Sequence, residues 1–170
     1  MQFVIILCLL VTNISASPTP GTTAYECPIT VPGTDRPDVS GSLFANDQAV
    51  IHEDGIWVSL PEDGVIELTP QDEILFGLSR GYRADEHTWL RDDGVTGFIV
   101  ITGKRLDQPS EHTPRNAVSP QRQYVKTGAV EASIAFPGAG CWEVTASVSE
   151  HQVTWVMEVR FVDAATPEPQ

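Results

Sequence analysis

The chain has 170 residues, and its 23 acidic residues outnumber its 10 basic residues, which gives a formal net charge of −13. A surface of that sign repels a phosphate backbone, so the composition argues against nucleic acid as a partner. The length suits one ordinary domain, large enough to bury about two-thirds of its unfolded surface.

The N-terminus has the features of a signal peptide. Residues 3–11 form an unbroken apolar run, and small and polar residues follow it. Such a run is too short to cross a bilayer as a helix but suits the apolar region of a leader. We expect residues 1–16 to be cleaved on secretion, with the mature protein extracellular or in the cell envelope. Association with a membrane is expected only if the leader is not cleaved.

The rest of the chain predicts one folded domain between two tethers. Residues 17–24 are rich in Pro and Thr and predict a linker, and residues 164–170 predict a short disordered tail. The folded part then covers residues 25–163. Its acidic residues are scattered among Gly and Pro, which is typical of a solvated surface.

The folded part reads as strands and turns. Residues 56–60 and 65–68 predict a hairpin around a turn that contains Gly64, and residues 98–102 form a β-branched run between two glycines. Apolar and polar residues alternate through 142–148 and again through 153–162, which predicts a hairpin with one buried face. Residues 106–125 predict a crossover loop, with a short helix possible around 117–124. Together these patterns predict an all-β fold, an immunoglobulin-like two-sheet antiparallel β-sandwich.

Cys27 and Cys141 are the two cysteines that remain once the leader is removed. In a secreted chain they predict one disulfide, which would close a loop of 114 residues and stabilise the fold by roughly 4–5 kcal/mol on the chain-entropy argument. The alternative is a pair of free, buried thiols. Trp142 follows Cys141, and a Trp beside a disulfide is familiar in immunoglobulin-like sandwiches, although the order and spacing differ here.

Four segments resemble one group of proteins. Residues 136–145, FPGAGCWEVT, resemble the FPxxGCWEVTG segment of uncharacterised secreted bacterial β-sandwich proteins, and residues 25–30, 57–65 and 101–107 resemble other parts of the same group in the same order. The resemblance implies a bacterial envelope or extracellular origin and a compact β domain with the same cysteine pair. It implies no activity. Between residues 77 and 93 the group tends to have a tryptophan-rich patch, where this chain has Tyr82 and Trp89 among charges.

The sequence favours a non-catalytic protein. The four histidines, His52, His87, His112 and His151, lie in predicted loops. Residues 77–81, GLSRG, have the spacing of the G-x-S-x-G motif, but a nucleophile elbow needs the strand-to-helix turn of an α/β fold, which this all-β pattern does not predict. The H-E-x-x-H motif and calcium-loop spacing are missing from the chain, and sequence does not locate a hydrolytic carboxylate pair. We expect a protein that is not an enzyme and has no cofactor.

Copper is the one metal that the sequence raises. Cys141, His151 and Met157 are soft ligand types in the order of a blue-copper site. Nine residues separate the first two, however, and Met157 lies mid-strand on the apolar face. We therefore expect no metal.

A binding role remains. Residues 80–91 mix aromatic and charged side chains in what reads as a loop, and we predict Tyr82, Arg83, Trp89 and Arg91 as ligand contacts. The alternative is that the aromatic side chains of this loop fold back onto the core. The predicted function is a non-catalytic secreted or envelope-associated module with a binding or structural role, whose unknown partner would be a protein or a carbohydrate. A protease-inhibitor-like domain acting through its loops is the first alternative, and a hydrolase with a concave pocket is the second.

Overall fold

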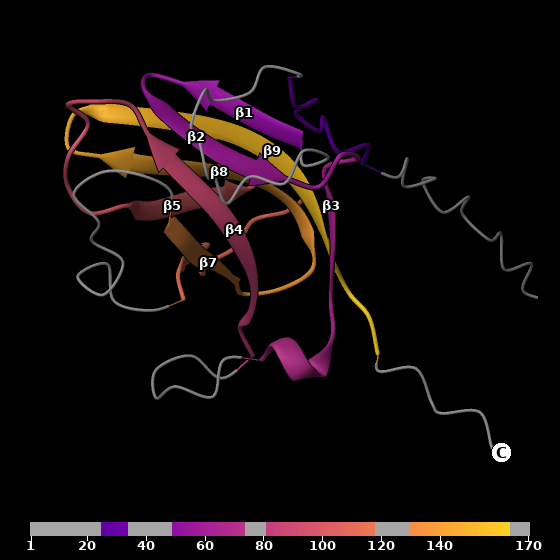
Figure 1. Cartoon of the computed structure of the whole chain (residues 1–170). Coiled ribbons are helices and arrows are strands. Elements are labelled where there is room, and N and C mark those ends of the chain that lie inside the picture. Colours follow the sequence, from indigo (N-terminus) through magenta and orange to yellow (C-terminus); the bar gives the residue numbers. More distant parts are fainter. Residues whose placement is uncertain (1–24, 34–48, 74–80, 118–129, 164–170) are drawn as a thin grey trace, which may run out of the picture.

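A computed structural model of the chain describes residues 25–33, 49–73, 81–117 and 130–163 (Figure 1). The expected leader, linker and tail lie outside these residues, as does most of the helix considered at 117–124. In the described segments the elements are β1 (Ala49–Glu53), β2 (Ile56–Leu60), β3 (Val65–Leu68), the 3-10 helix η1 (Pro70–Asp72), β4 (Arg83–Arg91), β5 (Val100–Arg105), β6 (Arg115–Asn116), β7 (Val130–Phe136), β8 (Gly140–Val148) and β9 (His151–Phe161).

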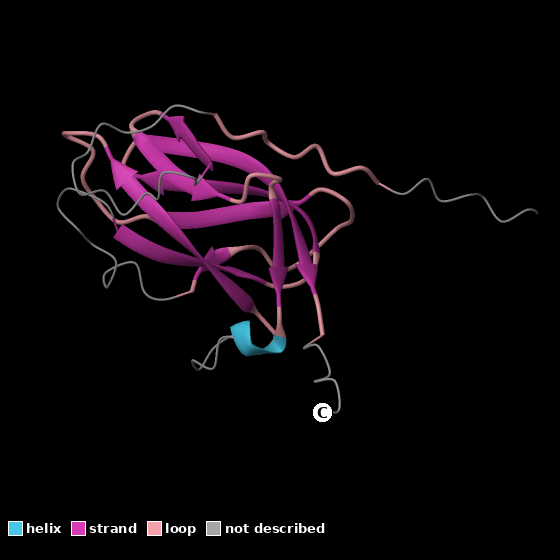
Figure 2. Ribbon diagram, turned by 45° about the vertical axis from the view of Figure 1, so that its right-hand side comes forward, coloured by secondary structure: helices cyan, strands magenta, loops and turns pink. Residues whose placement is uncertain are grey.

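The strands form two sheets. One sheet has the order β1-β2-β4-β7-β6 and the other has the order β3-β9-β8-β5. The sheets lie face to face, with η1 at one end of the layers (Figure 2). The predicted all-β sandwich is confirmed, with one departure from an antiparallel arrangement, because β3 runs parallel to β9. The immunoglobulin-like topology stays a prediction.

The alternation of apolar and polar residues explains the packing of the two sheets most clearly in β8 and β9. Their register runs from Gly140 opposite Val159 to Val148 opposite His151, which confirms the predicted C-terminal hairpin. The turn is shorter than expected, since it consists of Ser149 and Glu150. Every second side chain faces the other sheet and is buried, and each large apolar side chain so placed contributes roughly 1.5–3 kcal/mol. These inward residues are Trp142, Val144, Ala146, Val148, Val153, Trp155, Met157 and Val159.

The hairpin predicted for residues 56–60 and 65–68 is wrong. Strand β2 lies in the five-stranded sheet and β3 in the other, so the turn at residues 61–64 carries the chain from one sheet to the other. The hairpin partner of β2 is β1, through a two-residue turn at Asp54 and Gly55. Both turn residues have positive φ, 49° and 76°, as a tight hairpin of right-handed twist requires.

The outer edge of β9 is closed by side chains over its first half. The backbone N–H groups of Gln152 and Thr154 donate to the carboxylates of Asp54 and Glu53, at 3.0 and 3.3 Å. The N–H of Val156 donates to the hydroxyl of Thr30 at 2.8 Å. An uncovered edge is a template for adding another strand, so these acceptors protect the edge.

A membrane-spanning helix is not found in the described segments, where no helix has the length and apolar character to cross a bilayer.

Candidate functional site

Three of the four residues predicted to bind a ligand, Arg83, Trp89 and Arg91, lie on a central strand rather than in a loop. Strand β4 begins at Arg83, and Trp89 and Arg91 are 0 % and 5 % exposed. Trp89 packs against Trp155, with ring centroids 5.9 Å apart, and its indole N–H donates to the carbonyl of Ala132 at 3.1 Å. The prediction that Trp89 is an accessible contact is therefore corrected, because the ring fills the core between the sheets.

The two arginines of β4 close the sandwich at its two ends. Arg83 donates to the carbonyl of Leu68 at 2.7 Å, and its guanidinium lies 4.3 Å from the ring centroid of Phe161. Arg91 donates to the carbonyl of Gly97 at 2.8 Å. Both bonds satisfy carbonyl groups in or beside the opposite sheet, which gives these arginines a structural role.

Tyr82 is buried outside β4. Its hydroxyl donates to the carbonyl of Thr113 at 3.4 Å, and the guanidinium of Arg115 lies 4.2 Å from its ring centroid. Tyr82, Arg83, Trp89 and Arg91 thus contact different parts of the fold and do not form one surface.

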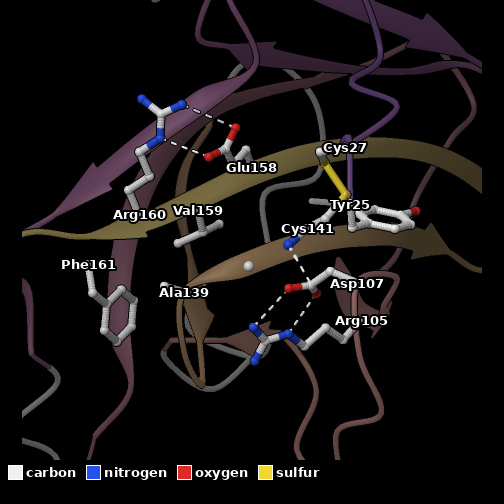
Figure 3. Close-up of a pocket in the computed structure, with 11 residues that line it drawn as sticks. Tyr25, Cys27, Arg105, Asp107, Ala139, Cys141, Glu158, Val159, Arg160 and Phe161 are labelled. Carbon is white, nitrogen blue, oxygen red and sulfur yellow. Dashed lines mark hydrogen bonds and ion pairs between the residues drawn. A yellow bond between two sulfur atoms is a disulfide. The ribbon is translucent and has the colours of Figure 1, made fainter. Parts of the chain in front are cut away.

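A cleft of about 450 Å³ lies elsewhere, at the disulfide (Figure 3). We call it the disulfide cleft. Its walls come from the N-terminal segment, the end of β5 and the residues after it, the β7–β8 turn with the start of β8, and the end of β9. The lining residues are Tyr25, Cys27, Arg105, Asp107, Ala139, Gly140, Cys141, Glu158, Val159, Arg160 and Phe161.

The disulfide joins Cys27 to Cys141, as predicted, with 5.5 Å between their Cα atoms. Cys141 lies opposite Glu158 on the outer face of its sheet, whereas the next residue, Trp142, points into the core. The bridge therefore attaches the N-terminal segment to the outside of the sandwich and does not cross the core.

The first polar pair of the cleft is a bidentate ion pair, which we call a fork, between Arg105 and Asp107. Two parallel bonds join them, Nε to Oδ1 at 2.7 Å and Nη2 to Oδ2 at 3.0 Å. Asp107 also accepts a bond from the backbone N–H of Cys141 at 3.3 Å. The hydrogen bond from Arg105 is the main cause that lowers the pKa of Asp107 below its ordinary value of 3.8. Asp107 is therefore an ionised acceptor with a fixed orientation.

The second polar pair is a similar fork on β9. Arg160 donates to Glu158 through Nε at 2.8 Å and Nη2 at 3.2 Å. The residues are two apart, so their side chains share the outer face of the strand. The Arg160 side chain is 50 % exposed and the Glu158 side chain is 33 % exposed, which leaves both accessible from the cleft.

Tyr25 is the exposed aromatic side chain beside the two forks, whereas the ring of Phe161 packs against the core and the guanidinium of Arg83. Tyr25 is 50 % exposed beside the disulfide and Asp107, and Phe161 lies at the opposite end of the cleft beyond Val159 (Figure 3). The two arginines and two carboxylates of the forks cancel in charge. The cleft is thus charge-balanced in a chain whose formal charge is −13.

Two of the four histidines occupy places that differ from the prediction. His87 lies in β4 and is 2 % exposed, with Nδ1 2.9 Å from the carbonyl oxygen of Ser59 and Nε2 3.4 Å from Asp85. His52 lies in β1, and its ring stacks on Trp57 with centroids 3.7 Å apart.

The other two histidines lie at the surface. His151 is the first residue of β9, next to the turn where it was expected, and forms an ion pair with Asp54 at 3.1 Å. His112 lies in a loop, as predicted.

The residues considered for copper have other partners. Cys141 is in the disulfide, and Met157 is fully buried and accepts the indole N–H of Trp155 at 3.3 Å. Among the residues that the structure describes, no three His, Cys, Asp or Glu side chains lie close enough to hold a metal ion.

Comparisons add no relative. No family model matches the chain, and no curated protein matches it. The resemblance of residues 136–145 to secreted bacterial proteins therefore stays a prediction.

The sequence analysis missed the disulfide cleft, although one signal was present. Arg105 and Asp107, like Glu158 and Arg160, are opposite charges two residues apart near the end of a strand. In a strand that spacing places both members on one face, as it does for Glu158 and Arg160 in β9, whereas Asp107 lies beyond the end of β5. The sequence does not show that the two pairs flank the same disulfide.

Proposed function

We propose that the chain is a secreted, non-catalytic module that binds carbohydrate in the disulfide cleft, on an immunoglobulin-like sandwich. The observation that carries the proposal is the composition of the cleft, in which two arginine–carboxylate forks lie beside the exposed aromatic ring of Tyr25. A compartment that oxidises thiols fits both the disulfide and the expected leader.

The forks suit hydroxyl groups. A sugar hydroxyl both donates and accepts hydrogen bonds, and each fork offers carboxylate lone pairs beside guanidinium N–H groups. Because each arginine orients its carboxylate before a ligand arrives, little orientational freedom is lost on binding. Tyr25 adds an accessible aromatic surface for the apolar C–H face of a sugar ring.

The charge balance favours a neutral sugar. Arg105 and Arg160 are each neutralised by a neighbouring carboxylate, so the cleft offers no excess positive charge to an anionic polymer. The rest of the acidic chain repels such a polymer at longer range.

The state of Asp107 favours binding over hydrolysis. A glycosidase needs a carboxylic acid that keeps its proton near neutral pH, and such an acid has a raised pKa. The pKa of Asp107 is lowered by its bonds to Arg105, which keeps this carboxylate an acceptor.

An array of neutral oligosaccharides, followed by calorimetric titration of the best ligand, tests this proposal. Tyr25→Ala and Asp107→Asn should each weaken binding roughly tenfold, about 1.4 kcal/mol. Phe98→Ala is the matched control, since Phe98 is an exposed aromatic that does not line the cleft, and it should leave affinity unchanged. Failure of every oligosaccharide to bind, or equal affinity for the wild type, Tyr25→Ala and Asp107→Asn, would contradict the proposal.

A further inference from the structure

Residues 25–33, which we call the strap, lie along the sandwich without belonging to a named strand. In Figure 1 the strap is the indigo segment beside the β3 end of the molecule. Besides the disulfide, the strap is bonded to the rest of the described chain at two places. Thr30 exchanges two hydrogen bonds with Val156, at 2.9 and 2.8 Å, and the N–H of Gly33 donates to the carbonyl of Val50 at 2.9 Å.

Apart from the disulfide, little holds the strap in place. Tyr25 and Val31 are 50 % and 85 % exposed, so the strap buries little apolar surface through them. Ile29 is partly buried and packs against Gly64 so closely that a β-carbon at position 64 would overlap the Ile29 side chain. The free energy that a partly exposed hydrogen bond contributes is about equal to the entropic cost of ordering one residue. The strap has three such bonds but nine ordered residues, so the hydrogen bonds alone do not offset the cost of ordering it. The covalent bond at Cys27 therefore decides whether the strap stays on the sheet.

The strap also supplies part of the disulfide cleft. Tyr25 is two residues from Cys27 and forms one wall (Figure 3). The opposing groups, such as Arg105 and Arg160, belong to paired strands that do not depend on the strap. The cleft is thus complete only while Cys27 is bonded to Cys141.

We propose that the Cys27–Cys141 disulfide is a redox latch that assembles the binding cleft. This inference rests on the proposed function for its effect on sugar affinity, but release of the strap can be measured without a sugar. Oxidation holds Tyr25 at the cleft, and reduction releases the strap and withdraws that wall. The protein would then bind its ligand more tightly once it reaches an oxidising compartment.

The chemical step is thiol–disulfide exchange with an external dithiol. One thiolate of the reductant attacks the sulfur of Cys27, which is partly exposed in the cleft, whereas Cys141 is 4 % exposed. The S–S bond breaks, and Cys141 leaves as a thiolate that takes up a proton. The second thiol of the reductant then resolves the mixed disulfide. Two electrons pass to the protein, which gains two thiols, and the reductant becomes a disulfide.

Amide hydrogen exchange tests the latch on the full chain with and without dithiothreitol, and on the C27S/C141S variant. The amides of Thr30 and Val156 should lose at least tenfold in protection on reduction and in the variant. The amide of Val144, inside the β8–β9 hairpin, should stay strongly protected, although its protection falls with the global stability that the bridge also provides. Unchanged protection at Thr30 and Val156 would overturn the latch. A fall of Val144 to the same unprotected level as Thr30 and Val156 would also overturn it, because the bridge would then hold the whole sandwich.

Titration with the best neutral oligosaccharide separates this inference from the proposed function. Reduction should weaken binding about as much as Tyr25→Ala does, and reduction of Tyr25→Ala should add little, because both changes remove the same wall. If the strap is released and neither redox form binds sugar, the latch stands and the carbohydrate proposal fails. If the oxidised protein binds and Thr30 stays protected on reduction, the carbohydrate proposal stands and the latch fails.

Discussion

The guanidinium of Arg105 occupies the space beside Gly140 that a β-carbon would fill. A Cβ atom at Gly140 would lie 2.5 Å from Nη2 and 2.6 Å from Nε of Arg105. The φ of Gly140 is +146°, which side chains of L-residues rarely adopt. Gly140 therefore has two separate physical reasons to be glycine, and one of them is the position of the fork between Arg105 and Asp107.

Gly140→Ala should lower the free energy of unfolding by about 1–3 kcal/mol, because it combines backbone strain with displacement of a guanidinium. Urea unfolding followed by tryptophan fluorescence measures the change. Gly138→Ala is the matched control, since the nearest atom to a Cβ there, Nη1 of Arg105, is 4.0 Å away and the contact is ordinary. Equal effects of the two variants would show that Arg105 does not require glycine at position 140.

Trp89→Ala should lower the free energy of unfolding by about 3–5 kcal/mol, since it leaves a cavity between the sheets and removes the indole bond to the carbonyl of Ala132. Phe98→Ala, at a 43 % exposed aromatic, should cost less than about 1 kcal/mol in the same urea titration. A small effect of Trp89→Ala on stability would restore Trp89 as a candidate for the surface.

The sequence predicted best where local alternation decides the structure. Strands β8 and β9 alternate without interruption and pair with each other, so their hairpin and its buried face follow from the pattern alone. Strand β4 was missed because its inward positions include Arg83 and His87, which the pattern reads as a loop. Those side chains are tolerated because carbonyl groups distant in sequence are their partners. Arg83 donates to the carbonyl of Leu68, and Nδ1 of His87 lies within hydrogen-bonding distance of the carbonyl of Ser59.

Long-range pairing accounts for the other errors. A turn that contains Gly64 suits a hairpin and a change of sheet equally well, and only the parallel partner β9, about 90 residues later, distinguishes the two. The disulfide cleft was missed for the same reason. Its walls at Tyr25, Arg105 and Arg160 are each separated by more than 50 residues, and their proximity follows from the sheet order and the disulfide.

The pair of His151 and Asp54 predicts a pH dependence of stability. The hydrogen bond between the two side chains raises the pKa of His151 above 6.5 and lowers the pKa of Asp54 below 3.8. The raised pKa of His151 adds stability that is fully present below pH 6.5 and is lost as the pH rises through the folded pKa. The lowered pKa of Asp54 adds stability that is present above pH 3.8 and is lost as the pH falls through its folded pKa. The pair should therefore stabilise most between these two values.

Both groups are at the surface, so the effect should be small and sensitive to salt. Urea unfolding of the wild type and of His151→Gln at pH 5 and pH 9 measures it. The wild type should exceed the variant at pH 5 by more than it does at pH 9. The same difference at both pH values would mean that the ion pair does not contribute to folding.

The fork at Asp107 predicts how sugar binding should respond to acid. The carboxylate must be ionised to accept bonds from both Arg105 and a ligand, and Arg105 lowers its pKa below 3.8. Protonation would remove the acceptor and loosen the fork. Affinity for the best neutral oligosaccharide should therefore be constant from pH 8 to pH 5 and should fall only below pH 3.8.

Calorimetric titration at pH 8, 5 and 3 makes this measurement, with near-ultraviolet circular dichroism at each pH to show that the buried tryptophans keep their environment. In the Asp107→Asn variant the side chain at position 107 cannot ionise. Its sugar affinity, which is weaker than that of the wild type, should therefore show no change between pH 5 and pH 3 that arises from this position. A wild-type affinity that already falls between pH 8 and pH 5 would contradict the assignment. The group that controls binding would then titrate near neutrality, as histidine does, and the disulfide cleft contains no histidine among its described lining residues.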